Sequence, residues 1–476
     1  MLLFLINTAA AEELSLQSAL SEALQENIEL QQAGLELRRA EAYVQLVRGG
    51  FDPTLSIGTD QAASASPSND SDDNVSVVNS TDVGLSAQLS QGLPTGGALS
   101  LGWSESVSSS DAASQVSEVY VGDYAWLSVT QPLLSGAWSA ARVDVRDALL
   151  MLSSQELSHR QSVERLVLQV SDAYWGLVAA GEQLRLAAES ASIAEQQFTE
   201  ITERFDEGFA GSGEVLQVER ALGVSRQSEV VAQADVAAAQ NRLARLIGRP
   251  LQASEDIQPS ERPLVSESSI ELQYSIAQAQ ASNSGWLMEQ IAAQQAQQTL
   301  AAARINVLPD LSVSGSLGLS GGDSSAGAAR QQITELSNPT WSMGADLTVA
   351  IPARTARAQR TRALLSAEHA RLTLAAAEQD LIAEVEAAVQ SLQRDRARVR
   401  LAQQTLEAAQ LALEADQELH REGLASTREV ILSLEALNTA QVSMLNAQID
   451  LQASQLDLLR LEGRLLESLE ITPPGW

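Results

Sequence analysis

The chain of 476 residues is long enough for two or three domains, but only 4% of its residues are aromatic, which argues against a conventional aromatic-rich core. Its net charge of −31 argues against a phosphate-binding role, so we expect no nucleic-acid partner. The absence of Cys excludes disulfides, thiolate chemistry and cysteine-based metal sites. His159, His369 and His420 lie far apart without metal-ligand spacing, and we predict neither a metal site nor a cofactor.

The chain begins MLLFLINTAAAEE, an apolar run followed by small residues at Ala9 and Ala11. This pattern is typical of the end of a secretory signal peptide, although no basic segment precedes it. We expect residues 1–11 to be a signal-peptide remnant, with an ordinary N-terminal segment as the alternative. No apolar run reaches 18 residues, so no transmembrane helix is predicted.

The composition then changes in an ordered way over a first unit, residues 12–250. Apolar residues recur every three or four positions over 14–47, which predicts a helix. Residues 51–131 are rich in Ser, Gly, Val and Thr with period-two alternation, as in TLSIGTD and VGLSAQLSQGL, which predicts strands. Residues 137–248 contain no Pro and predict a long helical hairpin with its turn at Gly208.

The same order of elements recurs after a proline-containing linker at 251–267. The second unit is predicted to contain a helix over 270–306, strands over 308–352 and a helical hairpin over 355–466, within residues 268–470, followed by a tail at 471–476. We expect a polar loop to separate the two strands of this half.

Matched motifs support an internal two-fold repeat. Asn27 and Pro53 correspond to Asn283 and Pro309 at one constant shift in residue number. At a second shift, FDEGFAGSGEV at the first hairpin turn corresponds to HREGLASTREV at the second turn, and RLIGR corresponds to RLEGR. The protein is therefore interpreted as a duplicated unit of helix, strands and long hairpin.

The order, the duplication, the QPLLSG segment and the two hairpin turns resemble the TolC-type outer-membrane channels of efflux and secretion systems. This resemblance covers nearly all of the chain. It implies an α+β membrane protein, a homotrimer in which the protomers share one β-barrel in outer-membrane lipid and whose helices form a coiled-coil tunnel through the periplasm. The implied function is a passive exit duct that a periplasmic adaptor protein and an inner-membrane pump or ABC transporter complete.

The strand region departs from the family pattern and leaves two questions open. The first half has about four strand-like segments where the family usually has two, so the extra segment 83–106 either widens the barrel or lies outside it. Aromatic residues of the strand region are expected to form interfacial girdles or to plug the barrel-tunnel junction: Phe51, Trp103, Tyr120, Tyr124, Trp126 and Trp341. The prolines expected at that junction are Pro53, Pro132, Pro309 and Pro352.

Each hairpin turn allows a local and a functional interpretation. Gly208 and Gly423 can end the first helix of each hairpin, Ser212 and Ser426 can cap the second, and Glu214 and Glu429 would lie in its first turn. By resemblance, Glu429 and Glu214 instead form the carboxylate ring of a periplasmic gate, with mutually raised pKa values and cation selectivity. Leu432 replaces a second acidic residue of the family and could form an apolar ring.

The same turns supply candidates for docking and for a lock between helices. Gly208 and Phe209, with Gly423 and Leu424, match the tips that meet the adaptor protein in the family, although a helix C-cap contact is the alternative. The familiar lock is not carried over, because Ala425 and His420 replace its residues. Salt-bridge candidates that could replace it are Asp206, Arg421, Glu422 and Arg428.

Two other classes of protein are weighed. An enzyme is not expected, because no nucleophile–base motif, phosphate loop or metal constellation appears. A soluble periplasmic coiled-coil scaffold is the stronger alternative, but it leaves the strand segments unexplained. The cargo and the class of pump are left open by the sequence.

Overall fold

The computed structural model describes residues 12–69, 75–111, 118–135, 140–250, 257–261, 271–422 and 424–471. The expected signal-peptide remnant, most of the linker, Gly423 and the tail beyond Ile471 lie outside these residues. The fold is mixed α and β. It divides into a helical unit (1–37, 155–289 and 374–476) and a strand unit (38–154 and 290–373), which are described separately.

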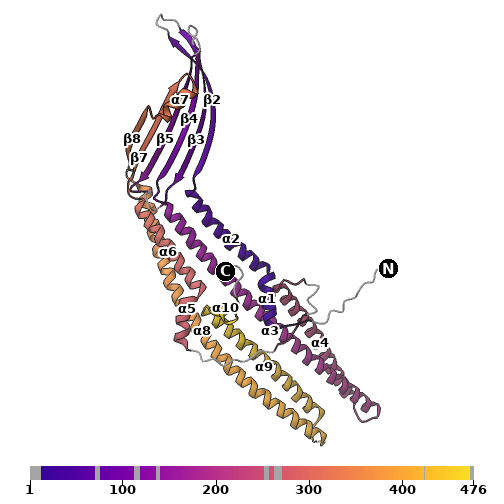
Figure 1. The fold of residues 1–476 in the computed structure, drawn as a ribbon. Coiled ribbons are helices and arrows are strands. Elements are labelled where there is room, and N and C mark those ends of the chain that lie inside the picture. The colour runs from indigo at the N-terminus through magenta and orange to yellow at the C-terminus, as the bar shows by residue number, and fades with distance from the viewer. Residues whose placement is uncertain are drawn as a thin grey trace, which may run out of the picture. The chain divides into compact units, whose positions relative to one another are not determined.

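The strand unit is built on one antiparallel sheet of six strands in the order β2-β3-β4-β5-β7-β8 (Figure 1). Its strands are β2 (Thr54–Asn69), β3 (Val75–Gly92), β4 (Ala98–Asp111), β5 (Glu118–Pro132), β7 (Asp310–Asp323) and β8 (Pro339–Thr348). The extra segment 83–106 forms parts of β3 and β4 and their connection. These two strands pair with β2 and β5, so the segment lies inside the sheet.

The register gives the sheet two chemically different faces. One row of paired residues crosses all six strands as five leucines and a tryptophan: Leu55, Leu89, Leu101, Leu127, Leu317 and Trp341. The adjacent row on the opposite face contains only hydroxyl side chains: Thr54, Ser90, Ser100, Ser128, Ser316 and Ser342. All six members of the first row are exposed large apolar side chains. The sheet thus has an apolar face and a hydroxyl face.

The aromatic residues of the sheet do not form a single band. Trp103 and Trp341 lie on the apolar face, whereas Tyr120, Tyr124 and Trp126 lie on the hydroxyl face, because paired residues project to the same side. Glycines on the neighbouring strands leave room for the latter three. A Cβ at Gly102 would meet the Trp126 ring, one at Gly318 would meet Tyr124 and one at Gly322 would meet Tyr120.

The connection between β7 and β8 is not the expected polar loop but helix α7 (Ala326–Thr334). Ser325 caps its N-terminus by accepting a hydrogen bond from the Ala328 amide. A Cβ at Gly321 would lie 2.0 Å from the Ala329 carbonyl oxygen, so glycine permits the close approach. Arg330 pairs with Glu105 at 2.5 Å. The helix therefore covers the apolar side of the sheet where charged residues replace the leucines.

The helices are arranged in two similar sets. The first contains α1 (Leu16–Glu26), α2 (Ile28–Arg48), α3 (Ala140–Asp206) and α4 (Ser212–Leu246). The second contains α5 (Leu272–Ser282), α6 (Ser284–Ile305), α8 (Arg354–Arg421), α9 (Thr427–Leu461) and the short α10 (Leu465–Ser468). A short strand in the linker, β6 (Ile257–Pro259), pairs in parallel with β1 (Glu12–Leu14). Residues 257–259 of the predicted linker therefore form a strand beside β1.

Two clusters of small and medium apolar side chains form the core of the helical unit. The larger one joins α1, α3, the end of α4 and α10, and it includes the fully buried Tyr174. The Tyr174 hydroxyl donates to the Leu14 carbonyl at 3.0 Å and accepts from the Glu261 amide at 3.3 Å. The second cluster joins α5, α8 and α9. Burial of these stripes, rather than intrinsic helix propensity, is what stabilises such helices.

The two shorter helices predicted over 14–47 and 270–306 are each broken, at Asn27 and at Asn283. Asn27 has an extended backbone, its side-chain oxygen accepts from the Leu30 amide at 3.0 Å, and its side-chain nitrogen donates to the Leu246 carbonyl at 3.0 Å. Asn283 makes the same two hydrogen bonds, with the Trp286 amide and the Leu461 carbonyl. Each asparagine therefore caps one helix and ties the break to the end of a long hairpin.

A glycine completes each of these connections. Gly248 and Gly463, from the RLIGR and RLEGR motifs, both have positive φ angles. A Cβ at Gly248 would lie 2.6 Å from the Glu26 Cβ, and one at Gly463 would lie 2.3 Å from the Ser282 carbonyl oxygen. Arg160, which pairs with buried Glu164 at 3.1 Å, also donates to the Gly463 carbonyl. Burial raises the pKa of Glu164 despite this guanidinium.

We expect Asn27→Ala to lower the free energy of unfolding by about 1–3 kcal/mol, because it removes two hydrogen bonds at a buried position. Thermal denaturation of the purified protein, followed by circular dichroism, measures the change. Gln32→Ala on the exposed side of α2 serves as the control, with an expected effect within about 0.5 kcal/mol. Equal stability of the two variants would contradict this role of Asn27.

Candidate functional site

The hairpin turns that join α3 to α4 and α8 to α9 lie at the same end of the helical unit (Figure 1). Each turn joins helices of 67 or 68 residues to helices of 35 residues. Apolar residues are exposed at both turns, where the core clusters no longer cover them. These turns are the candidate functional site.

At the first turn, Gly208 ends α3 in the left-handed conformation, with φ of +83°. The Gly208 amide donates to the Phe205 carbonyl at 3.0 Å, and the Phe209 amide donates to the Arg204 carbonyl at 2.8 Å. Open space surrounds Gly208, so its backbone angle rather than crowding requires glycine. The Phe209 side chain is 74% exposed.

The expected serine cap of this turn is wrong. Gly211 is the N-cap residue of α4, it provides no side-chain hydrogen bond, and Ser212 is already the first helical residue. Glu214 lies exposed in the first helical turn, as expected. Its carboxylate can therefore favour the helix only through the dipole, without a reciprocal cap.

At the second turn, the expected cap is present. The Ser426 hydroxyl accepts from the Glu429 amide at 3.4 Å, while the Glu429 carboxylate accepts from the Ser426 amide at 2.6 Å and from its hydroxyl at 2.9 Å. This is a reciprocal capping box at the start of α9. Leu424 is 73% exposed beside it, and Leu432 is also exposed.

These hydrogen bonds determine the ionisation of Glu429 in the single chain. The Ser426 amide, and then its hydroxyl, hold the pKa of the Glu429 carboxyl below its ordinary value. The raised pKa expected from three adjacent carboxylates is therefore not a property of the protomer. Glu429 is ionised at neutral pH and is held by its own helix.

The proposed alternative lock between helices does not form within the protomer. Arg421 pairs with Glu418, three residues earlier in the same helix, at 2.7 Å, and both side chains are largely exposed. The salt bridges among the described residues do not include Asp206, Glu422 or Arg428, whose side chains are exposed. The four candidates thus do not connect the two hairpins.

Other polar contacts, which sequence reasoning missed, hold the long helices together. Within the second hairpin, Asp416 accepts from the Ser433 hydroxyl, and Arg398 pairs with Asp450 at 2.5 Å. The Asn438 side chain of α9 donates to the Ser190 hydroxyl of α3 at 3.2 Å, which joins the two hairpins. These partners are separated by up to 248 residues, so no local spacing in the sequence indicated them.

The four prolines predicted at the junction lie where strands meet connections to helices. Pro53 and Pro309 precede β2 and β7, Pro132 ends β5, and Pro352 follows β8 through a cis peptide bond. Nearby, the Leu133 amide donates to the Leu311 carbonyl at 2.7 Å. Proline suits these positions because it has no backbone N–H to continue a ladder or a helix.

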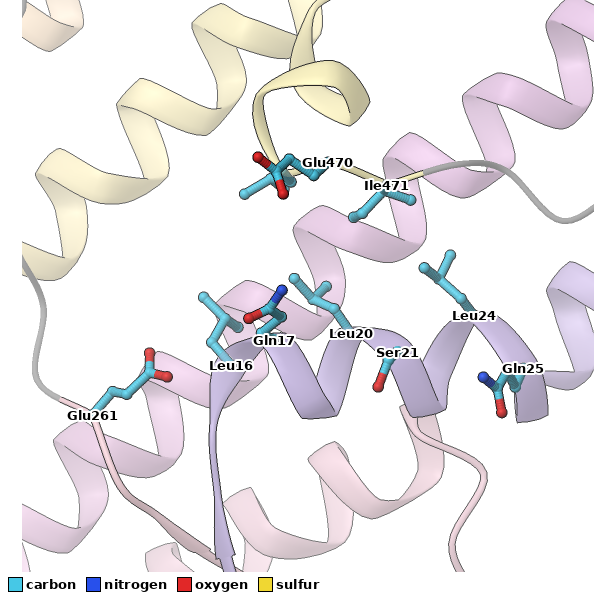
Figure 2. Close-up of a pocket in the computed structure, with 10 residues that line it drawn as sticks. Leu16, Gln17, Leu20, Ser21, Leu24, Gln25, Glu261, Glu470 and Ile471 are labelled. Atoms are coloured by element: carbon cyan, nitrogen blue, oxygen red, sulfur yellow. The ribbon is translucent and has the colours of Figure 1, made fainter.

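A cavity of about 580 Å³ lies in the helical unit between α1 and the segment that follows α10 (Figure 2). Leu16, Leu20 and Leu24 line it from α1, opposite Ile471, and all four belong to or pack on the larger core cluster. Glu261 and Glu470 are its charged lining residues. We interpret this cavity as a packing gap at the edge of the larger core cluster.

Within the described parts of the chain, no helix combines the length and the apolar character needed to cross a membrane. The same residues contain no group of three or more His, Asp or Glu side chains placed to hold a metal ion.

The sequence profile of the outer membrane efflux protein family matches residues 98–249 and 275–464. The chain belongs to this family. The resemblance stated from the duplicated motifs and the predicted outer-membrane location are confirmed.

Two relatives within the curated proteins come from Pseudomonas aeruginosa. The pyoverdine export outer membrane protein OpmQ is 28% identical over 332 residues, which cover 67% of this chain and 65% of that protein. The alkaline protease secretion protein AprF is 32% identical over 130 residues, which cover 27% of this chain and 26% of that protein. Both matches span less than two thirds of the relative's own length.

Solved structures of outer-membrane channels share the fold. VceC of Vibrio cholerae superposes with a TM-score of 0.66 at 16% identity and covers 96% of both chains. CmeC of Campylobacter jejuni superposes with a TM-score of 0.70 at 16% identity, covering 94% of this chain and 86% of that one. These likenesses show that the chain shares the fold of these proteins.

We expect Ser426→Ala to destabilise the start of α9 by about 0.5–2 kcal/mol, because it removes the N-cap. The matched variant Ser212→Ala should have little effect, because Gly211 is the cap of α4. Hydrogen exchange of the first amides of each helix measures both. Similar loss of protection in the two variants would contradict the asymmetry.

The contribution of Glu429 to this cap should depend on pH. Because its folded-state pKa lies below the ordinary value, the stabilisation is present above the ordinary pKa and is lost as pH falls through the lowered value. As pH is lowered, the first amides of α9 should therefore lose more protection against hydrogen exchange than the first amides of α4.

Proposed function

We propose that this protein is the passive outer-membrane exit duct of a tripartite efflux pump or a type I secretion system. The observation that carries the proposal is the sheet with a continuous exposed leucine row on one face and a hydroxyl row on the other. Such alternation suits strands between lipid and water. Each strand has 10 residues or more, which is enough to cross the hydrocarbon layer.

The assembly in this proposal is a homotrimer. The strands of three protomers close one β-barrel in outer-membrane lipid, since an open sheet edge in lipid would leave backbone groups unpaired. The paired long helices build a coiled-coil tunnel through the periplasm. The names of OpmQ and AprF, an export protein and a secretion protein, support this class of function.

The internal two-fold repeat is also part of the proposal. It is supported by the equivalent hydrogen bonds of Asn27 and Asn283 and by the equivalent close contacts of Gly248 and Gly463. Both pairs close a hairpin onto a broken helix in each half.

A soluble periplasmic scaffold fits the helices but not the sheet. Its apolar face would expose Leu55, Leu317 and Trp341 to water, each more than 60% accessible. Soluble monomers rarely leave an apolar band of this extent uncovered.

Separation of inner and outer membranes tests the proposed function. Expressed with a signal peptide in a Gram-negative host, the protein should enter the outer membrane and be extracted as a trimer. The mass of the detergent-extracted species measures this. A soluble periplasmic monomer would overturn the proposal.

We also propose that Glu429, with Glu214 and Leu432 near it, forms the periplasmic gate, and that Glu429 makes the duct cation-selective. Its lowered pKa keeps the carboxylate charged, which supports the attraction of cations. Glu429→Gln removes the charge while an amide can still serve the capping box, so the reversal potential in a salt gradient should move toward zero. Glu414→Gln, which removes an exposed carboxylate within α8, is the control and should leave the selectivity unchanged. Unchanged selectivity of Glu429→Gln contradicts the gate role.

The hairpin tips are proposed to dock a periplasmic adaptor protein, which in turn joins the duct to an inner-membrane pump or ABC transporter. Exposed Phe209 and Leu424, beside Gly208 and Gly423, support docking through apolar contact. Leu424→Asp should abolish crosslinking to the adaptor protein while trimers still form. Leu411→Asp, at an equally exposed position within α8, should crosslink normally. Normal crosslinking of Leu424→Asp contradicts tip docking.

A further inference from the structure

The sheet of the strand unit ends at two strands whose outer edges have no partner strand in the described chain, β2 and β8. Both carry strongly exposed apolar side chains on the apolar face: Leu55 is 64% and Trp341 is 74% accessible. Unpaired backbone groups in lipid are costly, so these edges need partners if the sheet enters the membrane.

The number of strands makes the two edges complementary. All neighbouring strands of the six-stranded sheet are antiparallel, so β2 and β8 run in opposite directions. The β8 edge of one copy can therefore pair with the β2 edge of the next and continue the antiparallel order. Neither edge strand then needs a partner from its own chain.

A closed barrel also requires a stagger, and its size here follows from which residues of β2 and β8 are paired between copies. The row of paired residues that begins at Thr54 on β2 reaches Ser342 on β8. Thr348, the last residue of β8, lies six positions farther along the strand. If Thr54 of one copy pairs with Thr348 of the next, each copy contributes a stagger of six positions, and this even shift keeps Leu55 beside Leu347 on the apolar face.

We propose that three copies of the six-stranded sheet close into a barrel of 18 strands by pairing β2 of each copy with β8 of its neighbour. The stagger then equals the number of strands, as in eight-stranded barrels of shear 8, whose strands tilt by about 36°. Membrane barrels tilt by about 35–45°. This inference rests on the proposed trimeric duct and specifies how its subunits join.

A barrel of this size encloses water and not packed side chains. Barrel diameter grows roughly linearly with the number of strands, and barrels of about 16–18 strands contain an aqueous channel. The lumen would be lined by the hydroxyl face, with serine and threonine across every strand and with the carboxylates of Asp60, Asp82 and Asp346. The extra hairpin of β3 and β4 thus widens the membrane pore.

Engineered cysteines test the junction, and the natural chain contains no cysteine that would interfere. The variant with both Thr54→Cys and Thr348→Cys should form covalent trimers on a denaturing gel after oxidation. Each single variant should remain monomeric. The matched pair Thr54→Cys with Ser342→Cys, which tests a junction without stagger, should also remain monomeric.

Each other result overturns the inference in a distinct way. A link within one chain would show that the protomer closes on itself, and linking of the Ser342 pair would show the wrong register. Electron cryo-microscopy of the unmodified trimer provides an independent count: 18 strands support the proposal, and a smaller barrel with β3 and β4 outside it overturns it. A trimer without the Thr54–Thr348 link refutes this junction alone, whereas failure to trimerise refutes the proposed function.

Discussion

The strand unit depends on its register. Side chains in a strand alternate between faces, so a slip by one residue would exchange the leucine row with the hydroxyl row over the whole sheet. The pairing from Leu55 to Trp341 prevents this, because each of the six strands contributes one large apolar residue to the same row. Bulky aromatics that fall on the hydroxyl face are accommodated by glycines opposite them, as Trp126 is by Gly102. Small residues on this face therefore serve both packing and the proposed water-filled lumen.

The helical unit is fixed by a different constraint, the satisfaction of backbone groups where helices end. Asn27 and Asn283 each cap the helix that follows. Each side-chain nitrogen also donates a hydrogen bond to a backbone carbonyl at the end of a hairpin, that of Leu246 or Leu461. The neighbouring glycines permit contacts that a side chain would block. These contacts lie at the opposite ends of the hairpins from the turns. The core clusters do not include the turn residues Phe209 and Leu424, which are exposed. An anchored base with uncovered tips suits a structure that meets a partner at one end.

Much of the fold could be predicted because its signals are local and repeated. Period-two alternation located the strands, long Pro-free segments located the hairpins, and the matched motifs indicated the family. The breaks at Asn27 and Asn283 were missed because helical periodicity continues across them, and the carbonyls that accept hydrogen bonds from the two side chains lie 219 and 178 positions away. Helix α7 was missed because Gly and Ser surround a segment of only nine residues. At the turns, GSGE and ASTRE both offered a serine cap, yet only Ser426 lies at the N-cap position.

The width of the proposed barrel bears on where passage is controlled. A lumen between 18 strands is too wide for its own walls to select cargo by close contact, and its hydroxyl lining offers no strong charge partner apart from a few aspartates. In this proposal, selection and closure are assigned to the two hairpin turns, which a threefold assembly would bring together. There the capping box of Ser426 keeps the Glu429 carboxylate ionised without a basic partner on a neighbouring helix. Opening would require the hairpins to separate while this cap stays intact. The salt bridge of Arg421 lies within its own helix, so it does not hold the hairpins together.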